Sequence, residues 1–386
     1  MSSSNFDKFR GRADQRRGRG RLFSCLLIAL LFLTACVRTG TPITAEPPGS
    51  IQWPQVPFPA RIEWVKTIAD DQAAGIGKGF WKKVADFFTG AEKRHIVRPH
   101  GVLFDDSERL FIADPGAGLV HCMEMKEGRY TLIGREAGSS LRSPIGLAED
   151  ELGRLYISDS TTGMVYVYDL VRRSLRPLLR QKLQRPTGIA YSRVTKLLYI
   201  VDTTIAQVIA VDATGEERLR FGAPGEGMVQ FNHPTDIAVD GRGRLYVTDP
   251  LNYRIKVFSS EGRLLNELGA AGDTLGSLNK PKGVAVDSDG HIYVSDALLD
   301  AVQMFDGSGR LLLSFGMTGT GNGQFWMPSG IYIDRRDYIF VADTYNRRVQ
   351  VFRYLSDARP ADRKTLPPIG KGVPNGGPKG QGGISQ

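Results

Sequence analysis

The sequence is poor in cysteine and histidine, which limits the chemistry that it can carry. Its 386 residues hold three cysteines and five histidines. The cysteines stand far apart, at positions 25, 36 and 122, so no disulfide framework and no C-x-x-C zinc or haem site can be built from them. A G-x-S-x-G nucleophile elbow is also absent.

Long helical periodicity is missing between residues 98 and 353, and a repeat occupies this region instead. Six copies align on a proline and on a closing aspartate. The prolines are Pro99, Pro144, Pro186, Pro234, Pro281 and Pro328. The aspartates are Asp114, Asp159, Asp202, Asp249, Asp296 and Asp343. A period of 42 to 48 residues between prolines marks a solenoid, a propeller or an array.

Each copy has the pattern of short antiparallel strands. In the fourth copy the runs are IAVD, RLYVTD, RIKVF and RLLNELG, rich in β-branched and aromatic residues and separated by Gly, Asp, Asn and Pro. Four short strands in about 45 residues, repeated without helices, are typical of a propeller blade. The pattern therefore predicts an all-β protein, a six-bladed β-propeller.

The strand count also predicts how the ring closes. The last copy ends after its third strand, at 347–354, and so lacks a fourth. An isolated strand-like run, RIEWVKTIA, stands at 61–69, before the first copy. Because an unpaired sheet edge promotes aggregation, we expect the strand 61–69 to complete the last blade and close the ring.

With these motifs the sequence resembles the NHL-repeat family of six-bladed propellers. The signature is P-x-G-[IV]-x-x-D followed by [LI]-[YF]-[IV]-x-D, with N-x-R-[IV]-x-[VM]-F in the third strand. Blades four and six fit the third-strand motif, through Asn252, Arg254, Asn346 and Arg348. Blades one to three lack both the Asn and the Arg, Ser192 replaces a strand-ending Asp, and Asp236 replaces the Gly. The resemblance covers residues 61–354 and implies the propeller fold, but it does not fix a function.

The N-terminus has the character of a secretory signal. A basic stretch up to Arg21 precedes the apolar run LFSCLLIALLFLTA at 22–35. The sequence LTAC at 33–36 resembles the lipobox of bacterial lipoproteins, which implies cleavage before Cys36 and diacylation of its thiol. The alternative is a plain membrane anchor with an incidental cysteine. Val37, which is not Asp, favours the outer membrane in a Gram-negative host, and we expect an outer-membrane-anchored lipoprotein that faces the periplasm or the cell surface.

The flanking segments extend this organisation. Residues 1–35 form the signal peptide, 36–60 carry the lipidated Cys36 and a Pro-rich tether, and 355–386 form a disordered tail. Between the first strand and blade one, the apolar spacing of GFWKKVADFFTG predicts a short amphipathic helix at about 79–89. We expect it to dock on the propeller and cap one mouth of the channel, and the alternative is a helix that binds a membrane surface or a partner.

The residues that follow the repeat proline should line the central channel. They are His100, Ile145, Thr187, Thr235, Lys282 and Ser329. The peptidyl-amidoglycolate lyase resembles this repeat and holds a catalytic zinc with three histidines near the axis. Here only His100 is a good zinc ligand at these positions, and Lys282 would oppose a cation. We therefore expect polar channel residues and no cofactor, and a divalent metal in the channel stays an alternative.

Surface recognition remains as the function to expect. The loops after the second strands vary, and they predict a binding face on the side of blades four to six, made of Tyr253, Arg254, Trp326, Tyr345 and Arg347. Phe231 and Phe325 occupy equivalent G-x-F positions and are expected to wedge between blades. The closing aspartates occur six times, and we expect them to accept hydrogen bonds from main-chain N–H groups.

These observations favour a non-catalytic, lipid-anchored scaffold that binds an envelope protein or peptide as a monomer. One alternative is a metal-dependent lyase or hydrolase with its site at the channel mouth. A second is RNA binding by a basic face. The chain carries a net charge of +9, but residues 1–35 hold seven basic and two acidic residues, so 9 − 5 leaves about +4 after cleavage. Export and this modest charge argue against a nucleic-acid partner.

Overall fold

The computed structural model describes residues 50–55, 57–70, 95–134 and 141–355. All of them belong to the second of two compact units, which begins at Ser50. The predicted signal peptide, Cys36, the helix at 79–89 and the tail beyond residue 355 lie outside the described residues. No helix within the described ranges has the length and apolar character that a bilayer span requires.

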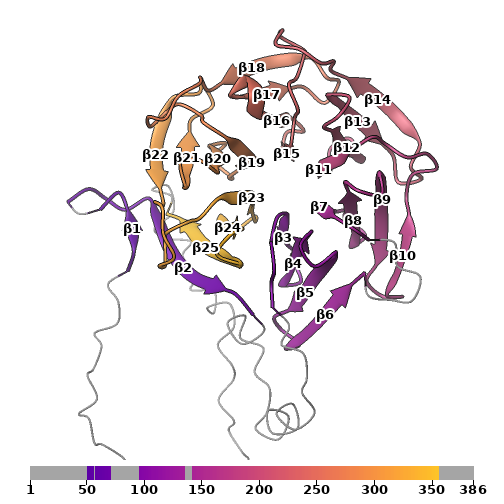
Figure 1. The fold of residues 1–386 in the computed structure, drawn as a ribbon, viewed down its shortest axis with the longest axis horizontal. Helices are drawn as coiled ribbons and strands as arrows, with labels where there is room; N and C mark the ends of the chain where they lie inside the picture. Colours follow the sequence, from indigo (N-terminus) through magenta and orange to yellow (C-terminus); the bar gives the residue numbers. More distant parts are fainter. Residues whose placement is uncertain (1–49, 56, 71–94, 135–140, 356–386) are drawn as a thin grey trace, which may run out of the picture. The chain divides into compact units, whose positions relative to one another are not determined.

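Six antiparallel sheets form the blades of a propeller (Figure 1). In blades one to five the strands follow the sequence order from the centre outward, and in blade six the last three strands of the chain are followed outward by its first two. Blade one is β3 (Val102–Phe104), β4 (Arg109–Asp114), β5 (Leu119–Glu124) and β6 (Arg129–Ile133), and blade two is β7 (Pro144–Glu149), β8 (Arg154–Asp159), β9 (Met164–Asp169) and β10 (Ser174–Pro177). Blade three is β11 (Pro186–Ser192), β12 (Leu197–Asp202), β13 (Gln207–Val211) and β14 (Glu217–Phe221), and blade four is β15 (Asp236–Val239), β16 (Leu245–Asp249), β17 (Arg254–Phe258) and β18 (Leu264–Leu268). Blade five is β19 (Pro281–Val286), β20 (Ile292–Asp296), β21 (Ala301–Phe305) and β22 (Leu311–Phe315), and blade six holds β23 (Pro328–Ile333), β24 (Tyr338–Asp343) and β25 (Arg348–Tyr354).

The sixth blade is completed from the other end of the chain, as the sequence predicts. Strand β2 (Ile62–Ile68) pairs antiparallel with β25, with Ile62 opposite Tyr354 and Ile68 opposite Val349. Ile62 and Ile68 are fully buried. The pairing joins the first and last strands of the ring, so the prediction of closure by residues 61–69 is confirmed.

The structure differs from the predicted tether over residues 36–60. A short strand β1 (Gln52–Trp53) adds a fifth strand to blade six by pairing with β2. The ring of Trp53 packs 5.8 Å from those of both Phe315 and Phe352, measured between centroids. Packing of this indole against blades five and six fixes residues 52 and 53 on the propeller, so the predicted tether does not include them.

The core lies between neighbouring blades. Second strands such as β16 and β20 are buried along their whole length, because each is covered by a blade on both faces. The prediction that Phe231 and Phe325 wedge between blades is confirmed, since both are fully buried. Phe231 packs among residues of blades three and four, and Phe325 among those of blades five and six. Burial of one such side chain contributes roughly 1.5–3 kcal/mol.

Blades two to five have a tyrosine at the same position of the second strand, where blades one and six have Phe111 and Phe340. In three of these blades the tyrosine hydroxyl bonds a carboxylate at the end of the first strand. The hydroxyls of Tyr156, Tyr246 and Tyr293 donate to Asp150, Asp240 and Asp287, at 2.9, 3.1 and 3.0 Å. In blade three Ser192 stands in place of that aspartate. The hydroxyl of Tyr199 donates instead to the carbonyl of Ser260 in blade four, at 3.1 Å.

In five of the six blades a glycine at the start of the inner strand lets neighbouring blades approach at the centre. A Cβ on Gly101 would lie 2.1 Å from the carbonyl oxygen of Ile145, and one on Gly330 would lie 2.2 Å from that of His100. Blade four has Asp236 at this position. Its carboxylate accepts the main-chain N–H of Val284 in blade five, at 3.1 Å, and so bridges the two inner strands.

The Asp236 carboxyl borders the channel and is ionised at a cost. Burial raises its pKa to about 7 from the ordinary 3.8, against the lowering effect of the N–H groups that it accepts. Since the folded-state pKa lies above the unfolded one, the folded state holds the proton more tightly. Stability from this group is present below about pH 4 and is lost as the pH rises toward 7.

Replacement Asp236→Asn should therefore stabilise the protein increasingly as the pH rises. The full shift corresponds to about 4 kcal/mol, and screening at the solvent-facing channel reduces the expected gain to roughly 2 kcal/mol at pH 8 relative to pH 4. Urea unfolding of both proteins across this range measures it. The exposed Asp273→Asn is the control and should leave the pH profile unchanged. A gain of Asp236→Asn that is independent of pH would contradict the assignment.

Candidate functional site on the top face

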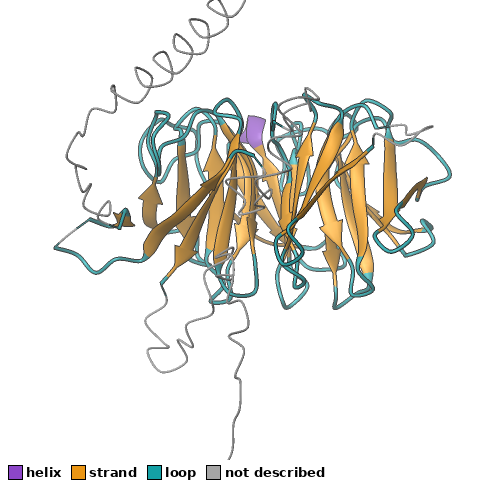
Figure 2. Cartoon of the chain, turned by 90° about the horizontal axis from the view of Figure 1, so that it is seen from below, coloured by secondary structure: helices purple, strands orange, loops and turns teal. Residues whose placement is uncertain are grey.

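The strands run between two faces of the propeller (Figure 2). We call top face the one that carries the turns after the second strands and the loops that enter the next blade. Pairs of these segments are joined by main-chain bonds, as from Ser160 N–H to the Ser143 carbonyl and from Ala297 N–H to the Lys280 carbonyl, both 3.0 Å. The single described helix, η1 (Pro250–Asn252), is one of these turns. The turns after the first strands lie on the opposite, bottom face.

The closing aspartates of the second strands hold the top-face loops. Asp296 shows the pattern, because its carboxylate accepts the N–H groups of Asn279, Lys280, Leu298 and Leu299 at 2.7 to 3.2 Å. All six closing aspartates are fully buried. The expectation that they accept main-chain hydrogen bonds is confirmed, and they bind the loop before the repeat proline as well as the following turn.

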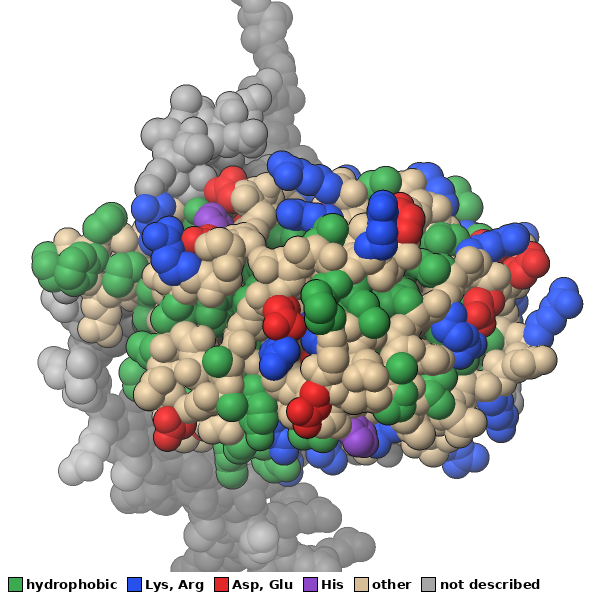
Figure 3. All heavy atoms as spheres, turned by 90° about the horizontal axis from the view of Figure 1, so that it is seen from above, with side chains coloured by type: hydrophobic (Ala, Val, Ile, Leu, Met, Phe, Trp, Pro, Cys, Tyr) green, Lys and Arg blue, Asp and Glu red, His purple; other side chains and the backbone are tan. Residues whose placement is uncertain are grey.

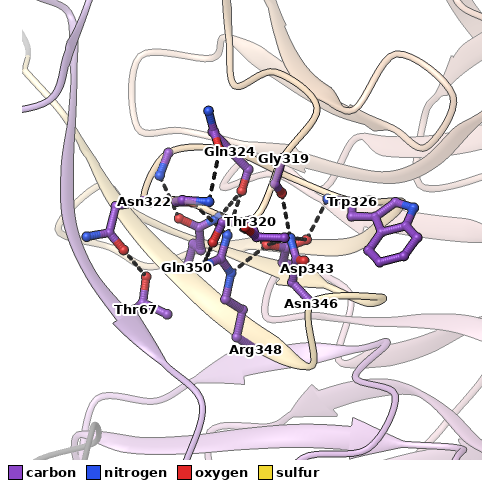
Figure 4. A network of polar contacts seen from close by, with 12 residues as sticks. Thr67, Gly319, Thr320, Asn322, Gln324, Trp326, Asp343, Asn346, Arg348 and Gln350 are labelled. Carbon is purple, nitrogen blue, oxygen red and sulfur yellow. Dashed lines mark hydrogen bonds and ion pairs between the residues drawn. The ribbon is translucent and has the colours of Figure 1, made fainter.

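The third-strand motif of blade six is part of the same framework (Figure 4). Arg348 donates to Asp343 at 2.7 Å and to the carbonyls of Thr320, Gly321 and Gln324 at 2.7 to 2.8 Å. Gln350 also donates to Gln324 and Asp343. These side chains hold the loop that enters blade six.

In blade four a different residue holds the loop that enters the blade. Lys256, fully buried, donates to the carbonyls of Gly227 and Gln230 at 2.7 and 2.5 Å, and its Nζ lies 3.6 Å from Asp249. Arg254 occupies the position in blade four that Arg348 occupies in blade six. It forms an ion pair with Glu267 at 3.1 Å on the rim instead. Arg254 was predicted for the binding face, and the structure places it in this pair.

The structure brings two of the predicted binding residues together. The rings of Trp326 and Tyr345 lie 5.5 Å apart at 37°, and their exposed fractions are 49% and 50%. Arg347, two residues after Tyr345, is exposed. Tyr253 and Arg254 border a separate depression in blade four, together with Glu226 and Glu267. The predicted face is therefore two patches, one on blade six and one on blade four.

The predicted channel residues lie around the axis near the top face, and two of them tie blades together. The hydroxyl of Thr187 lies 2.9 Å from that of Thr203, which donates to the Pro234 carbonyl. The hydroxyl of Thr235 donates to the Lys282 carbonyl at 3.2 Å. His100 and Lys282 line a cavity of about 410 Å³ at the top mouth of the channel.

The cavity also holds residues that sequence reasoning missed. Arg98, Arg185 and Lys280 line it and stand one position before the repeat proline. Comparison of the residue before the repeat proline in all six copies would have revealed these basic side chains, because this position is equivalent in every blade. The lower part of the channel is a separate cavity of about 240 Å³ with Asp105 and Glu149 among its lining. Burial and Asp105 raise the pKa of Glu149 to about 7, although Arg109 lies 3.1 Å away.

The histidines do not converge on a metal. Within the described residues no three His, Cys, Asp or Glu side chains group as metal ligands would. Burial, Lys282 and Arg98 lower the pKa of His100 to about 4, and these basic neighbours oppose a cation. His121 lies between Asp114 and Tyr130 inside blade one, and His291 bonds Asp287. The hydrogen bonds of His121 and His291 thus tie these side chains into the blades.

Comparison with known proteins agrees with the repeat and the fold. The NHL repeat profile matches residues 231–258, 278–297 and 325–352, which fall in blades four to six. The chain is 26% identical over 172 residues to NHL repeat-containing protein 2 of Gallus gallus, a match that covers 36% of this chain and 24% of the relative. The chain thus matches about a quarter of the length of that relative.

Similar solved structures share the fold at low identity. A structural genomics protein of unknown function from Bacteroides thetaiotaomicron has a TM-score of 0.57 at 14% identity, covering 76% of this chain and 75% of its own. Virginiamycin B lyase from Staphylococcus aureus has a TM-score of 0.52 at 12% identity, covering 68% of this chain and 97% of its own. At this identity the likeness shows the fold alone. The chain therefore carries NHL repeats, matched in blades four to six, and its six blades form a β-propeller.

Proposed function

We propose that the protein is a non-catalytic scaffold of the bacterial envelope, anchored by a lipid on Cys36, which binds a protein or peptide partner through Trp326 and Tyr345. The observation that carries the proposal is the half-exposed aromatic pair on the top face. Aromatic side chains of this kind supply large contact area and dominate the energetics of many interfaces. The exposed Arg347 nearby suits an acidic group beside an apolar anchor of the partner.

The fold does not require an aromatic residue at position 326. The N–H of Trp326 donates to Asp343 at 2.8 Å. In blades five and four, Asn279 and Asn232 make the same main-chain bond to the closing aspartate, at 2.7 and 2.6 Å. Since asparagine serves the framework equally well, the indole of Trp326 is available for contact.

The main chain holds both rings in place before any partner arrives. Besides the bond of Trp326 to Asp343, the N–H of Tyr345 donates to the Trp326 carbonyl at 3.2 Å. A fixed backbone lowers the ordering cost of binding. Hydrogen bonds within the framework occupy several side chains of the types that act in catalysis, namely the closing aspartates, His121 and Lys256. This supports a non-catalytic role.

The anchor and the compartment rest on the sequence. The basic and apolar segments before LTAC direct the chain out of the cytoplasm, and the lipid on Cys36 would hold it at the outer membrane, facing the periplasm or the surface. Because the chain is exported, we propose that its partner is a protein or peptide of the envelope and not a nucleic acid. We propose that the propeller works as a monomer, since its ring closes within one chain.

The partner site is tested by placing a photo-crosslinking side chain at Trp326 in living cells, with Leu298 as the matched control. Leu298 is 53% exposed and lies in the turn of blade five that is equivalent to the Tyr345 turn of blade six. We expect a discrete adduct from position 326 and none from 298. Trp326→Ala should weaken binding of the partner so identified at least about thirtyfold, as for an interface anchor, and Leu298→Ala should not. Equal crosslinking from both positions, or none, would refute the site.

The lipid anchor has its own test. Cys36→Ser should abolish metabolic labelling with a fatty acid and move the protein out of the membrane fraction, because the acceptor thiol is gone. Cys25→Ser, within the predicted signal peptide, is the matched control and should leave labelling unchanged. Labelling that persists in Cys36→Ser would show that the anchor lies elsewhere.

A further inference from the structure

Positive charge gathers at the top mouth of the channel without acidic residues among it. The cavity of about 410 Å³ is lined by Arg98, Arg185, Lys280 and Lys282, together with His100. No Asp or Glu is among its described lining residues. Hydroxyl-bearing side chains also line the wall, namely Ser143, Ser160, Ser329, Thr344 and Tyr345. The hydroxyls of Ser160, Ser329 and Thr344 donate to neighbouring protein oxygens.

The basic side chains come from alternate blades. Arg98 belongs to blade one, Arg185 to blade three, and Lys280 and Lys282 to blade five. Since these blades alternate around the ring, the charges approach the axis from three sides (Figure 1). Ser143 and Met327, from blades two and six, stand between them in the lining. A compact ligand on the axis would therefore have basic groups on three sides.

The framework fixes the backbone of three of the four residues. The N–H groups of Arg98, Arg185 and Lys280 donate to Asp114, Asp202 and Asp296 at 3.0, 3.1 and 3.0 Å. These carboxylates are fully buried and are engaged by main-chain donors. They hold the loops, and they form no ion pair with the basic side chains among the described residues. The site is thus preorganised without being neutralised.

Lys282 lies within the electrostatic influence of the other three basic residues. Burial, Lys280, Arg185 and Arg98 all lower the pKa of Lys282. On the rim, in contrast, basic side chains lie beside acidic ones (Figure 3), and Arg220 and Arg254 pair with Glu217 and Glu267. Repulsion at the mouth is relieved when an anion enters, because each basic group gains a charge-assisted hydrogen bond.

We propose that the top mouth of the channel binds a small, multiply charged oxyanion, a molecule that carries phosphate groups or several carboxylates. Two arginines offer bidentate donors to such groups, and the lysines add point charges. The cavity has room for a compact ligand. The site adjoins the proposed docking surface for a partner, because Tyr345 borders both. The test therefore leaves Tyr345 unchanged.

Isothermal titration of the purified protein with pyrophosphate and with citrate tests the site. We expect saturable one-to-one binding of at least one probe, and the comparison tells phosphate from carboxylate chemistry. Arg185→Gln and Lys282→Gln should each weaken it at least about tenfold. The control, Arg242→Gln, removes an exposed arginine from a bottom-face turn and should change affinity less than about twofold. Absence of binding of both probes by the unmodified protein, or an equal loss in the control, would overturn the proposal.

A second readout separates ligand binding from a structural role. Lys282→Gln removes one of four mutually repelling charges, so the melting temperature without ligand should stay the same or rise. Pyrophosphate or citrate should raise the melting temperature of the unmodified protein and leave that of Lys282→Gln nearly unchanged. A melting temperature that falls in the variant without ligand, with probe affinity retained, would assign Lys282 to the framework instead.

Discussion

Each blade buries one carboxylate at the end of its second strand, and the conformation of the top face depends on these six groups. A buried carboxylate is costly unless its lone pairs are satisfied, and in blades one, two, three and five main-chain N–H groups from two loops satisfy them. In blades four and six the side-chain amides of Asn252 and Asn346 replace the N–H groups of the following turn. Asp296 joins the segment before Pro281 to the turn at Leu298 and Leu299. In the loop before the repeat proline these hydrogen bonds come from the main chain, so the side chains at the bonded positions are free to differ between blades.

This freedom lets one framework present two different surfaces. At one bonded position blade six has Trp326 where blades four and five have asparagine, which gives an aromatic edge. At the next position blades one, three and five have Arg98, Arg185 and Lys280, which gives a basic mouth at the axis. The fold is common to proteins of unrelated function, and these substitutions within the repeat distinguish this chain.

The sequence was sufficient to predict the blades and their closure, because strand periodicity, repeat length and a missing fourth strand are local features. Strand β1 was missed, since two residues carry no periodicity and Trp53 is placed by packing on blades five and six. Arg254 matched the motif of Arg348, but Lys256 holds the loop in blade four. Two basic residues compete for one set of carbonyls, and a pattern does not say which one reaches them. The basic mouth escaped notice because the three segments that form it, at residues 98, 185 and 280–282, lie more than 80 residues apart and meet only once the ring closes.

The most direct measurement is amide hydrogen exchange in Asp296→Asn, because the central claim is that the closing aspartates hold the top-face loops. The amide side chain has a similar shape but turns an NH₂ group toward N–H donors. We expect the amides of Asn279 and Lys280 to exchange at least about tenfold faster in the variant, while the amide of Trp326, bound to Asp343, keeps its rate. Unchanged exchange at Asn279 and Lys280, in a variant that still folds, would contradict it.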